Sequence, residues 1–226
     1  MAPRKPRTPS KPPLGRDADG YLYDAFISYP QAGSVPEWVC DVIEPVLRKQ
    51  LTDVLGVPSR LYLDVKSEKP GNKWPKNMAD AHCTSRVIIP VLCAAYFRSG
   101  WCLAEWRTAT RREQLIRSRR RPDPKVVIPV WYNDRKPENL AHLQKGLRDE
   151  ILASSYQDFR PFNRLVKANV ATDSNMQAAF DFRDAVDKLC DVIREASTAA
   201  PRCSPRWPRL PEEPISGQDP RWRVKL

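Results

Sequence analysis

The chain has 226 residues, a net charge of +11 and 41% hydrophobic residues, which fits one domain with appendages rather than two full domains. Its six cysteines form no C-x-x-C pair and it has two histidines, so we expect no metal site of Cys/His type. No apolar run approaches the length of a membrane span, and the N-terminus has no apolar signal core. We therefore expect a cytoplasmic protein with reduced, mostly buried thiols.

Both ends of the chain are rich in proline and arginine. Five of the 23 prolines lie in residues 1–20 and six lie in residues 198–226. These compositions predict two disordered tails, at 1–20 and 198–226, around one folded domain at 21–197. The prolines recur at every third residue, which favours a stiff polyproline II spacer, with a ligand for a proline-binding domain as the alternative.

Between the tails, short apolar runs alternate with runs of helical spacing. Strands are predicted at 23–29, 60–64, 85–92 and 125–132, with a fifth near 156–159 or 165–166. Helices are predicted at 34–54, which Pro45 kinks or splits, and at 76–84, 98–118, 138–153 and 175–197. Apolar strands separated by helices indicate a parallel sheet covered on both faces. The fold class is therefore α/β, a flavodoxin-like doubly wound sheet of about five parallel strands.

Arginines are concentrated on the predicted helix 98–118 and just after it. They are Arg107, Arg111, Arg112, Arg117, Arg119, Arg120 and Arg121. We interpret this stretch as a solvated helix end followed by a loop, where arginine also suits the helix dipole. Nucleic-acid binding through phosphate contacts is the alternative. No readout motif or stacking platform accompanies the charge, so no specific nucleic-acid partner is expected.

Four sequence blocks resemble those of the TIR (Toll/interleukin-1 receptor) domain family. They are Tyr-Asp-Ala-Phe-Ile-Ser-Tyr at 23–29, Leu-Tyr-Leu-Asp at 61–64, Ser-Arg-Val-Ile-Ile-Pro-Val-Leu at 85–92 and Trp-Cys-Leu-Ala-Glu-Trp at 101–106. A loop bearing Pro and Gly follows the second block, as in the family. The last block is similar to the W-C-L-x-E-L motif of plant and many bacterial TIR domains. The resemblance extends in order and spacing over about residues 21–195.

The resemblance implies an NAD⁺ glycohydrolase of TIR type and places its essential glutamate at Glu105. Trp101 lies one helical turn earlier on the same face, where an aromatic side chain walls the nucleotide pocket in catalytic relatives. Nicotinamide leaves NAD⁺ as a neutral molecule, so one carboxylate that stabilises the oxocarbenium-like ribose is a sufficient minimal site. NAD⁺ is then a substrate and no cofactor is expected; the products are nicotinamide and ADP-ribose or a cyclic isomer. Without the resemblance, Glu105 is more simply a surface residue in ion pairs with arginines.

Five further residues are candidates for binding NAD⁺. Phe26, Ser28 and Tyr29 lie at the end of the first strand, where ligands bind in open parallel sheets. Trp74 matches an aromatic position that contacts the nucleotide in relatives. Glu68 matches an acidic position, with one more residue between it and Trp74 than in the family. The chain departs from the family after the first strand, where residues 29–33 replace a charged cluster.

The resemblance also implies partners and a biological setting. Catalytic relatives act as assemblies, so we expect self-association through TIR–TIR contacts that include the loop at 65–75, and a partner TIR or sensor protein. The implied role is immune or anti-phage signalling. Two alternatives stay open besides nucleic-acid binding: a non-catalytic TIR adaptor that acts by homotypic binding, with Glu105 on the helix surface, and a flavodoxin-like enzyme acting on free nucleosides.

Overall fold

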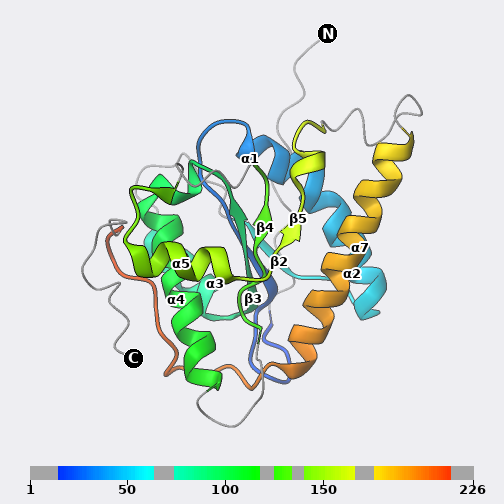
Figure 1. Cartoon of the computed structure of the whole chain (residues 1–226). Helices are drawn as coiled ribbons and strands as arrows, with labels where there is room; N and C mark the ends of the chain where they lie inside the picture. Colours follow the sequence, from blue (N-terminus) through cyan, green and yellow to red (C-terminus); the bar gives the residue numbers. More distant parts are fainter. Residues whose placement is uncertain (1–14, 64–73, 118–124, 134–139, 166–175, 215–226) are drawn as a thin grey trace, which may run out of the picture.

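The computed structural model describes residues 15–63, 74–117, 125–133, 140–165 and 176–214. Its centre is a sheet of five parallel strands in the order β2-β1-β3-β4-β5 (Figure 1). The strands are β1 (Tyr23–Ser28), β2 (Leu61–Leu63), β3 (Ser85–Leu92), β4 (Val130–Trp131) and β5 (Gln157–Asp158). The chain starts in the middle of the sheet, adds β2 on one side and then crosses to the other. This order confirms the predicted doubly wound, flavodoxin-like fold.

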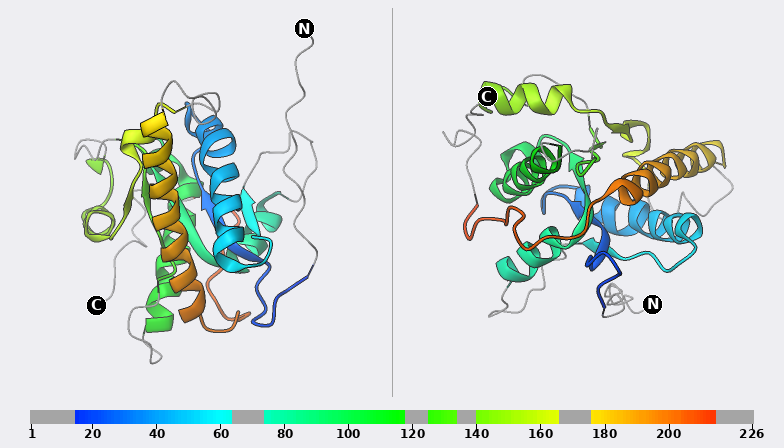
Figure 2. Two further views of the ribbon diagram at one scale, coloured as in Figure 1. Left: turned by 90° about the vertical axis from the view of Figure 1, so that its right-hand side faces the viewer. Right: turned by 90° about the horizontal axis from the view of Figure 1, so that it is seen from below.

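Helices cover both faces of the sheet. They are α1 (Val35–Trp38), α2 (Glu44–Leu55), α3 (Trp74–Cys83), α4 (Gly100–Arg117), α5 (Lys145–Ala153) and α7 (Met176–Ala199). The long helices α2 and α7 lie side by side on one face, and α3 and α4 lie on the other (Figures 1 and 2). Because both faces are covered, five of the six β1 residues and seven of the eight β3 residues are buried. None of the helices in these ranges is long and apolar enough to cross a membrane.

The predicted helix at 34–54 is divided at Pro45. After α1, residues Val39–Ile43 form a π-helical turn, η1, and α2 begins at Glu44. Proline has no N–H to donate back along a helix, so it suits the first turn of α2, and the widened π turn ahead of it keeps the helical path continuous. At the other end of α2, Gly56 adopts a left-handed conformation with φ of 69° and its N–H bonds the Thr52 carbonyl, which stops the helix.

Residues 200–214, which we call the C-terminal strap, run from the end of α7 to α4 and then along α4 (Figures 1 and 2). Trp207 and Leu210 of the strap are buried, and Trp207 packs on the ring of Tyr21 at 5.7 Å between centroids. The prediction of a disordered tail from residue 198 is therefore wrong for residues 198–214. The strap is ordered because two of its apolar side chains are buried, and because its prolines reduce the conformational entropy that the strap loses on folding. Residues 1–14 and 215–226 lie outside the described part.

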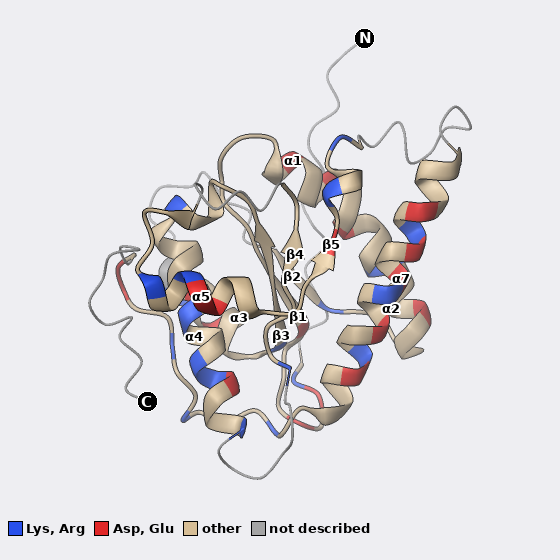
Figure 3. Ribbon diagram, in the orientation of Figure 1, with Lys and Arg blue, Asp and Glu red and all other residues tan. Residues whose placement is uncertain are grey.

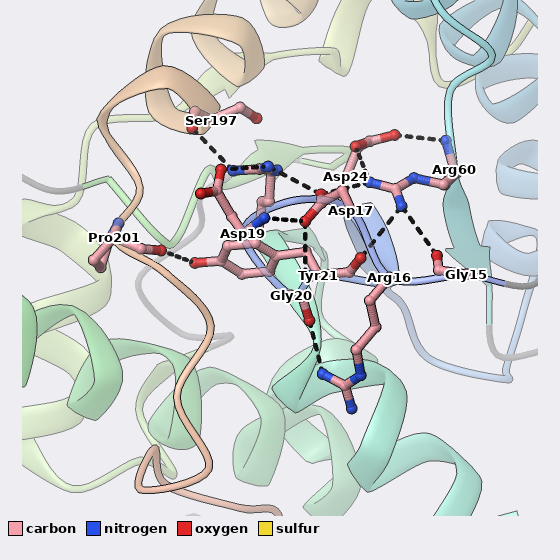
Figure 4. Close-up of polar contacts among 11 residues, drawn as sticks. Gly15, Arg16, Asp17, Asp19, Gly20, Tyr21, Asp24, Arg60, Ser197 and Pro201 are labelled. Atoms are coloured by element: carbon pink, nitrogen blue, oxygen red, sulfur yellow. Dashed lines mark hydrogen bonds and ion pairs between the residues drawn. The ribbon is translucent and has the colours of Figure 1, made fainter.

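A polar network joins the first residues of the domain to the amino-terminal edge of the sheet (Figure 4). The Asp17 carboxylate accepts from Arg60 at 2.8 Å and from Arg86 at 2.9 Å, and Arg60 also bonds Asp24 at 3.1 Å. Burial alone would raise the pKa of Asp17, but the hydrogen bond from Arg60 and the charge of Arg86 lower it. The Tyr21 hydroxyl donates to the Pro201 carbonyl at 2.7 Å. These contacts attach both ends of the described chain to one edge of the sheet.

All six cysteines are free thiols, and four of them are buried. This agrees with the prediction of mostly buried thiols. Burial raises the pKa of the Cys190 thiol to about 12 and also raises the pKa of Cys93. These two thiols are therefore packing residues with little thiolate at neutral pH.

Candidate functional site

The side chain of Glu105 lies at the carboxyl edge of the sheet. Glu105 is in the second turn of α4, and its residue surface is 4% exposed. The hydroxyl of Ser28, the last residue of β1, donates a hydrogen bond to Oε2 of Glu105. The carboxyl ends of parallel strands are where open α/β sheets bind ligands. The structure thus brings two predicted site residues, Glu105 and Ser28, into direct contact at that edge.

Tyr96 supports this pair from the helical turn η2 (Tyr96–Arg98). Its hydroxyl lies 3.0 Å from Oγ of Ser28 and 3.0 Å from the carbonyl oxygen of Cys102. The proton of Ser28 is directed at Glu105, so Tyr96 gives its single proton either to the Cys102 carbonyl or to Oγ of Ser28. Burial raises the pKa of Tyr96 well above its usual value, and the phenol stays neutral. Tyr96 therefore orients Ser28 without adding charge to the site.

His82 on α3 supports the main chain of Glu105. Its Nε2 lies 3.2 Å from the Glu105 carbonyl oxygen, which can only accept, so Nε2 carries the proton. Burial and the nearby charge of Arg112 lower the pKa of His82 to about 3. A histidine that remains neutral at physiological pH fixes the position of Glu105 and is not poised for acid–base chemistry. His82 was not predicted to have a role, because its contact with Glu105 joins two helices and is not visible in the sequence.

Phe26 and Tyr29 are packed in the core. Phe26 is fully buried, and its ring stacks on Tyr62 at 5.1 Å and meets His82 edge-on at 5.2 Å. Phe26 lies two residues before Ser28, so both side chains face α3 and α4. Tyr29 is 5% exposed, with its hydroxyl 3.8 Å from Sγ of Cys40. Phe26 therefore packs below Ser28 on the α3 side, whereas the Tyr29 hydroxyl contacts η1.

The structure describes only some of the other residues that were predicted to bind NAD⁺. Trp101 is half-buried on α4, packed against the core one turn before Glu105. Trp74 is the first residue of α3, but its side chain lies outside the described part of the structure. Glu68 and most of the loop at 65–75 also lie outside it. Trp106, in contrast, is 1% exposed and donates from Nε1 to Glu150 at 2.8 Å, so it is a core residue.

Arg112 lies two turns after Glu105 on the same inward face of α4. It is 2% exposed and donates to the carbonyl oxygens of Ser85 at 3.0 Å and Arg86 at 2.8 Å. Its guanidinium lies 4.8 Å from the ring centre of Trp207. The prediction that Arg112 belongs to a solvated basic stretch is therefore wrong, because seven residues are nearly two full turns and bring the side chain back to the sheet. Glu105 and Arg112 attach α4 to opposite edges of the sheet.

The parallel sheet, the helices on both faces and the carboxylate at the carboxyl edge define an α/β domain of flavodoxin-like type. The sequence from residue 26 to residue 166 matches the family described as "TIR domain". The match covers more than half of the chain, so the chain belongs to the TIR domain family, and the resemblance inferred from the four sequence blocks is confirmed.

Two solved structures resemble this chain. The TIR domain of the Toll-related receptor TRR-2 from Hydra magnipapillata is 19% identical, with 76% of this chain and 98% of that chain covered and a TM-score of 0.42. The TIR domains of the activated Roq1 resistosome, which directly recognises the pathogen effector XopQ, are 22% identical, with 75% and 84% covered and a TM-score of 0.35. No curated protein sequence matches the chain.

Proposed function

We propose that this TIR domain cleaves NAD⁺ at the bond between nicotinamide and ribose, with Glu105 as the catalytic residue. The observation that carries the proposal is the burial of the Glu105 side chain against Ser28 at the carboxyl edge of the sheet. Burying a carboxylate is costly, and a domain that acts only by docking gains nothing from it. An ionisable group buried at a ligand-binding edge is a typical feature of an active site.

The chemistry needs one carboxylate and no general acid. The bond from ribose C1′ to the pyridinium nitrogen breaks, and its electron pair leaves with nicotinamide, which departs neutral. The Glu105 carboxylate stabilises the positive charge that develops on the ribose. Water then adds to C1′ and loses a proton, giving ADP-ribose; attack by a nucleophile of the same molecule gives a cyclic isomer instead.

Substrate binding requires a change of partner at Glu105. The Ser28 hydroxyl now donates to Oε2, which is the acceptor that a ribose hydroxyl would use. Exchange of one hydroxyl donor for another keeps the carboxylate hydrogen-bonded throughout, so the exchange costs little. Ser28 and Tyr96 then act as positioning residues, because they hold the carboxylate before the substrate arrives.

We further propose that cleavage depends on association of several copies of the chain, or of the chain with a partner TIR or sensor protein, in immune or anti-phage signalling. Residues 65–75 are the proposed contact loop. Assembly would place the loop of one copy over the site of its neighbour. The specific activity is then expected to rise with protein concentration.

The first experiment measures nicotinamide release from NAD⁺ at high protein concentration with a crowding agent. The wild type, Glu105→Gln and the control Glu195→Gln are compared; Glu195 is exposed on α7 and far from the sheet edge. We expect release by the wild type and the control, and at least a hundredfold loss in Glu105→Gln with unchanged circular dichroism. Removal of one key electrostatic group typically costs about 10²–10³ in rate.

Three results would overturn the proposal. No release by the folded wild type under any assembly condition would favour the adaptor, whose partner is another TIR domain. Full release by Glu105→Gln would show that the catalytic group lies elsewhere. Cleavage of free nucleosides but not of NAD⁺ would instead indicate the nucleoside-processing enzyme.

A further inference from the structure

A pocket of about 220 Å³ lies between the outer side of α4 and the C-terminal strap. It is lined by Ala104, Arg107, Thr108, Arg111, Pro208, Arg209 and Pro211. Three of these seven residues are arginines and none is acidic. Ala104 borders this pocket, while the side chain of the next residue, Glu105, faces β1 on the inner side of the helix. The pocket is therefore separate from the proposed NAD⁺ site.

The three arginines come from two elements that the fold brings together. Arg107 and Arg111 are four residues apart on α4 and share one face, where like charges repel. Arg209 adds a third guanidinium from the strap, and both elements carry basic residues beside acidic ones (Figure 3). Its ion pair with Asp80 spans 3.3 Å between side chains that are 58% and 45% exposed, so it offsets little of this repulsion. An anion bound in the pocket would meet guanidinium groups from both elements.

Thr108 supplies a neutral hydrogen-bonding group at the same place. It is 7% exposed, and its hydroxyl makes no hydrogen bond to another residue of the described chain, although it lines the pocket. A ligand oxygen that enters the pocket can form a hydrogen bond with this hydroxyl. Pro208 and Pro211 form the opposite wall, and their restricted φ angles limit the backbone conformations of the strap there.

We propose that this pocket binds a phosphate or pyrophosphate group. Guanidinium groups match phosphate oxygens in charge and in their forked geometry, and the Thr108 hydroxyl adds a donor. The volume is below the range of about 300–1,000 Å³ that is typical for sites of drug-sized ligands. It therefore suits a phosphoryl head group rather than a whole dinucleotide. The pocket is a second ligand site and does not depend on NAD⁺ cleavage.

The test is calorimetric titration of the full chain with inorganic pyrophosphate at low ionic strength. We expect saturable binding that Arg111→Gln and Arg209→Gln each weaken roughly tenfold. Thr108→Val keeps the shape and the net charge, and is expected to weaken binding severalfold. The matched control is Arg183→Gln, which removes the same charge from an exposed position on α7. The control and Glu105→Gln are expected to bind as the wild type does.

Several outcomes would overturn the inference. One is the absence of saturable pyrophosphate binding, and another is unchanged affinity in Thr108→Val and Arg209→Gln. A third is equal loss of affinity in Arg183→Gln, which would indicate general attraction to a chain of net charge +11. A further contradicting outcome is that pyrophosphate alone gives no signal, while a single-stranded oligonucleotide binds and is not displaced by pyrophosphate. That outcome would indicate an extended basic surface instead of a phosphate pocket. Displacement of pyrophosphate by adenosine diphosphate would identify a soluble phosphate source. Displacement by vesicles containing phosphatidic acid would identify a lipid head group; either result supports the pocket.

Discussion

The Ser28 hydroxyl connects Glu105 to Tyr96, and Tyr96→Phe tests that connection. The substitution keeps the buried ring, which packs on Phe97 at 5.9 Å, and removes the hydroxyl that serves Ser28 and Cys102. We expect a loss of about 1–2 kcal/mol in the free energy of unfolding, because a buried hydrogen-bond donor is removed from its acceptor. Any NAD⁺ cleavage should fall severalfold, because Ser28 no longer holds a fixed position. Urea unfolding and nicotinamide release are the two measurements.

The control is Tyr23→Phe. Tyr23 is half-buried, with its ring 5.2 Å from Tyr62 and no hydrogen bond from its hydroxyl within the described structure. It should leave both measurements nearly unchanged. If Tyr96→Phe also leaves stability and nicotinamide release unchanged, Tyr96 does not position Ser28 for function.

His82 makes stability depend on pH. Its pKa falls from an ordinary 6.5 in the unfolded chain to about 3 in the folded chain, because the ring is buried and lies near the charge of Arg112. The unfolded state therefore binds a proton between these two values and the folded state does not. Stability is fully present above about pH 6.5 and declines toward pH 3, by roughly 1 kcal/mol per pH unit. The His82→Gln variant should be less stable at pH 7 and lose less on going to pH 5, as measured by urea unfolding. Parallel curves for variant and wild type would contradict the assignment.

The sequence singled out Glu105 and Ser28, which the structure places in contact in the candidate site, but not the residues that support them. The Trp-Cys-Leu-Ala-Glu-Trp block singled out Glu105, and the end of the first strand singled out Ser28. Tyr96 and His82 were missed because each acts through a contact between distant segments, 68 residues apart for Tyr96 and Ser28 and 23 apart for His82 and Glu105. From the sequence, a tyrosine or a histidine that makes such a hydrogen bond cannot be distinguished from one that only packs in the core.

At the scale of elements, α4 is held against the sheet at both ends. Glu105 reaches β1 near the start of the helix, and Arg112 reaches the first residues of β3 nearer its end. The strap closes over Arg112 with the Trp207 ring. Changes in the strap should therefore reach the proposed active site through the position of α4, although no strap residue touches Glu105 in the contacts described.

Trp207→Ala measures how much the strap contributes. The variant removes a side chain that is 9% exposed, together with its contacts to Tyr21 and Arg112, and it uncovers a buried guanidinium. We expect a loss of about 3 kcal/mol in the free energy of unfolding, typical of a large aromatic residue in a packed site. Trp207→Phe keeps an aromatic face over Arg112 and should lose less than half as much. Equal, small losses in both variants would mean that the strap is only loosely attached.

The order of the elements was predictable, and their lengths were less so. The prediction of 85–92 for the third strand matches β3, because its apolar run is bounded by polar residues. The fourth strand was predicted at 125–132, yet β4 covers Val130–Trp131, with an isolated bridge between Val127 and Ile88. Pro129 lacks an N–H and interrupts the ladder between these pairings. The strap was missed because proline and arginine content says little about where a single tryptophan packs.

At the scale of the whole molecule, charge opposes assembly. The net charge of +11 makes copies of the chain repel one another, and basic residues lie on several elements, α4 and the strap among them (Figure 3). The same positive charge favours phosphate binding in the pocket between α4 and the strap, whereas it disfavours assembly. Salt therefore separates the two proposals, because screening weakens attraction and repulsion alike.

We expect NAD⁺ cleavage per molecule to rise, at fixed protein concentration, when NaCl increases from about 0.03 M to about 0.3 M, since the screening length falls several-fold over this range. The physical reason is that screened copies associate more readily. Pyrophosphate affinity should fall over the same range. Nicotinamide release measured with light scattering, at several protein concentrations, checks both the association and its effect. Cleavage that is independent of protein concentration at every salt level would show that a single chain forms the complete active site, and the charge of the molecule would then govern only its binding of anions.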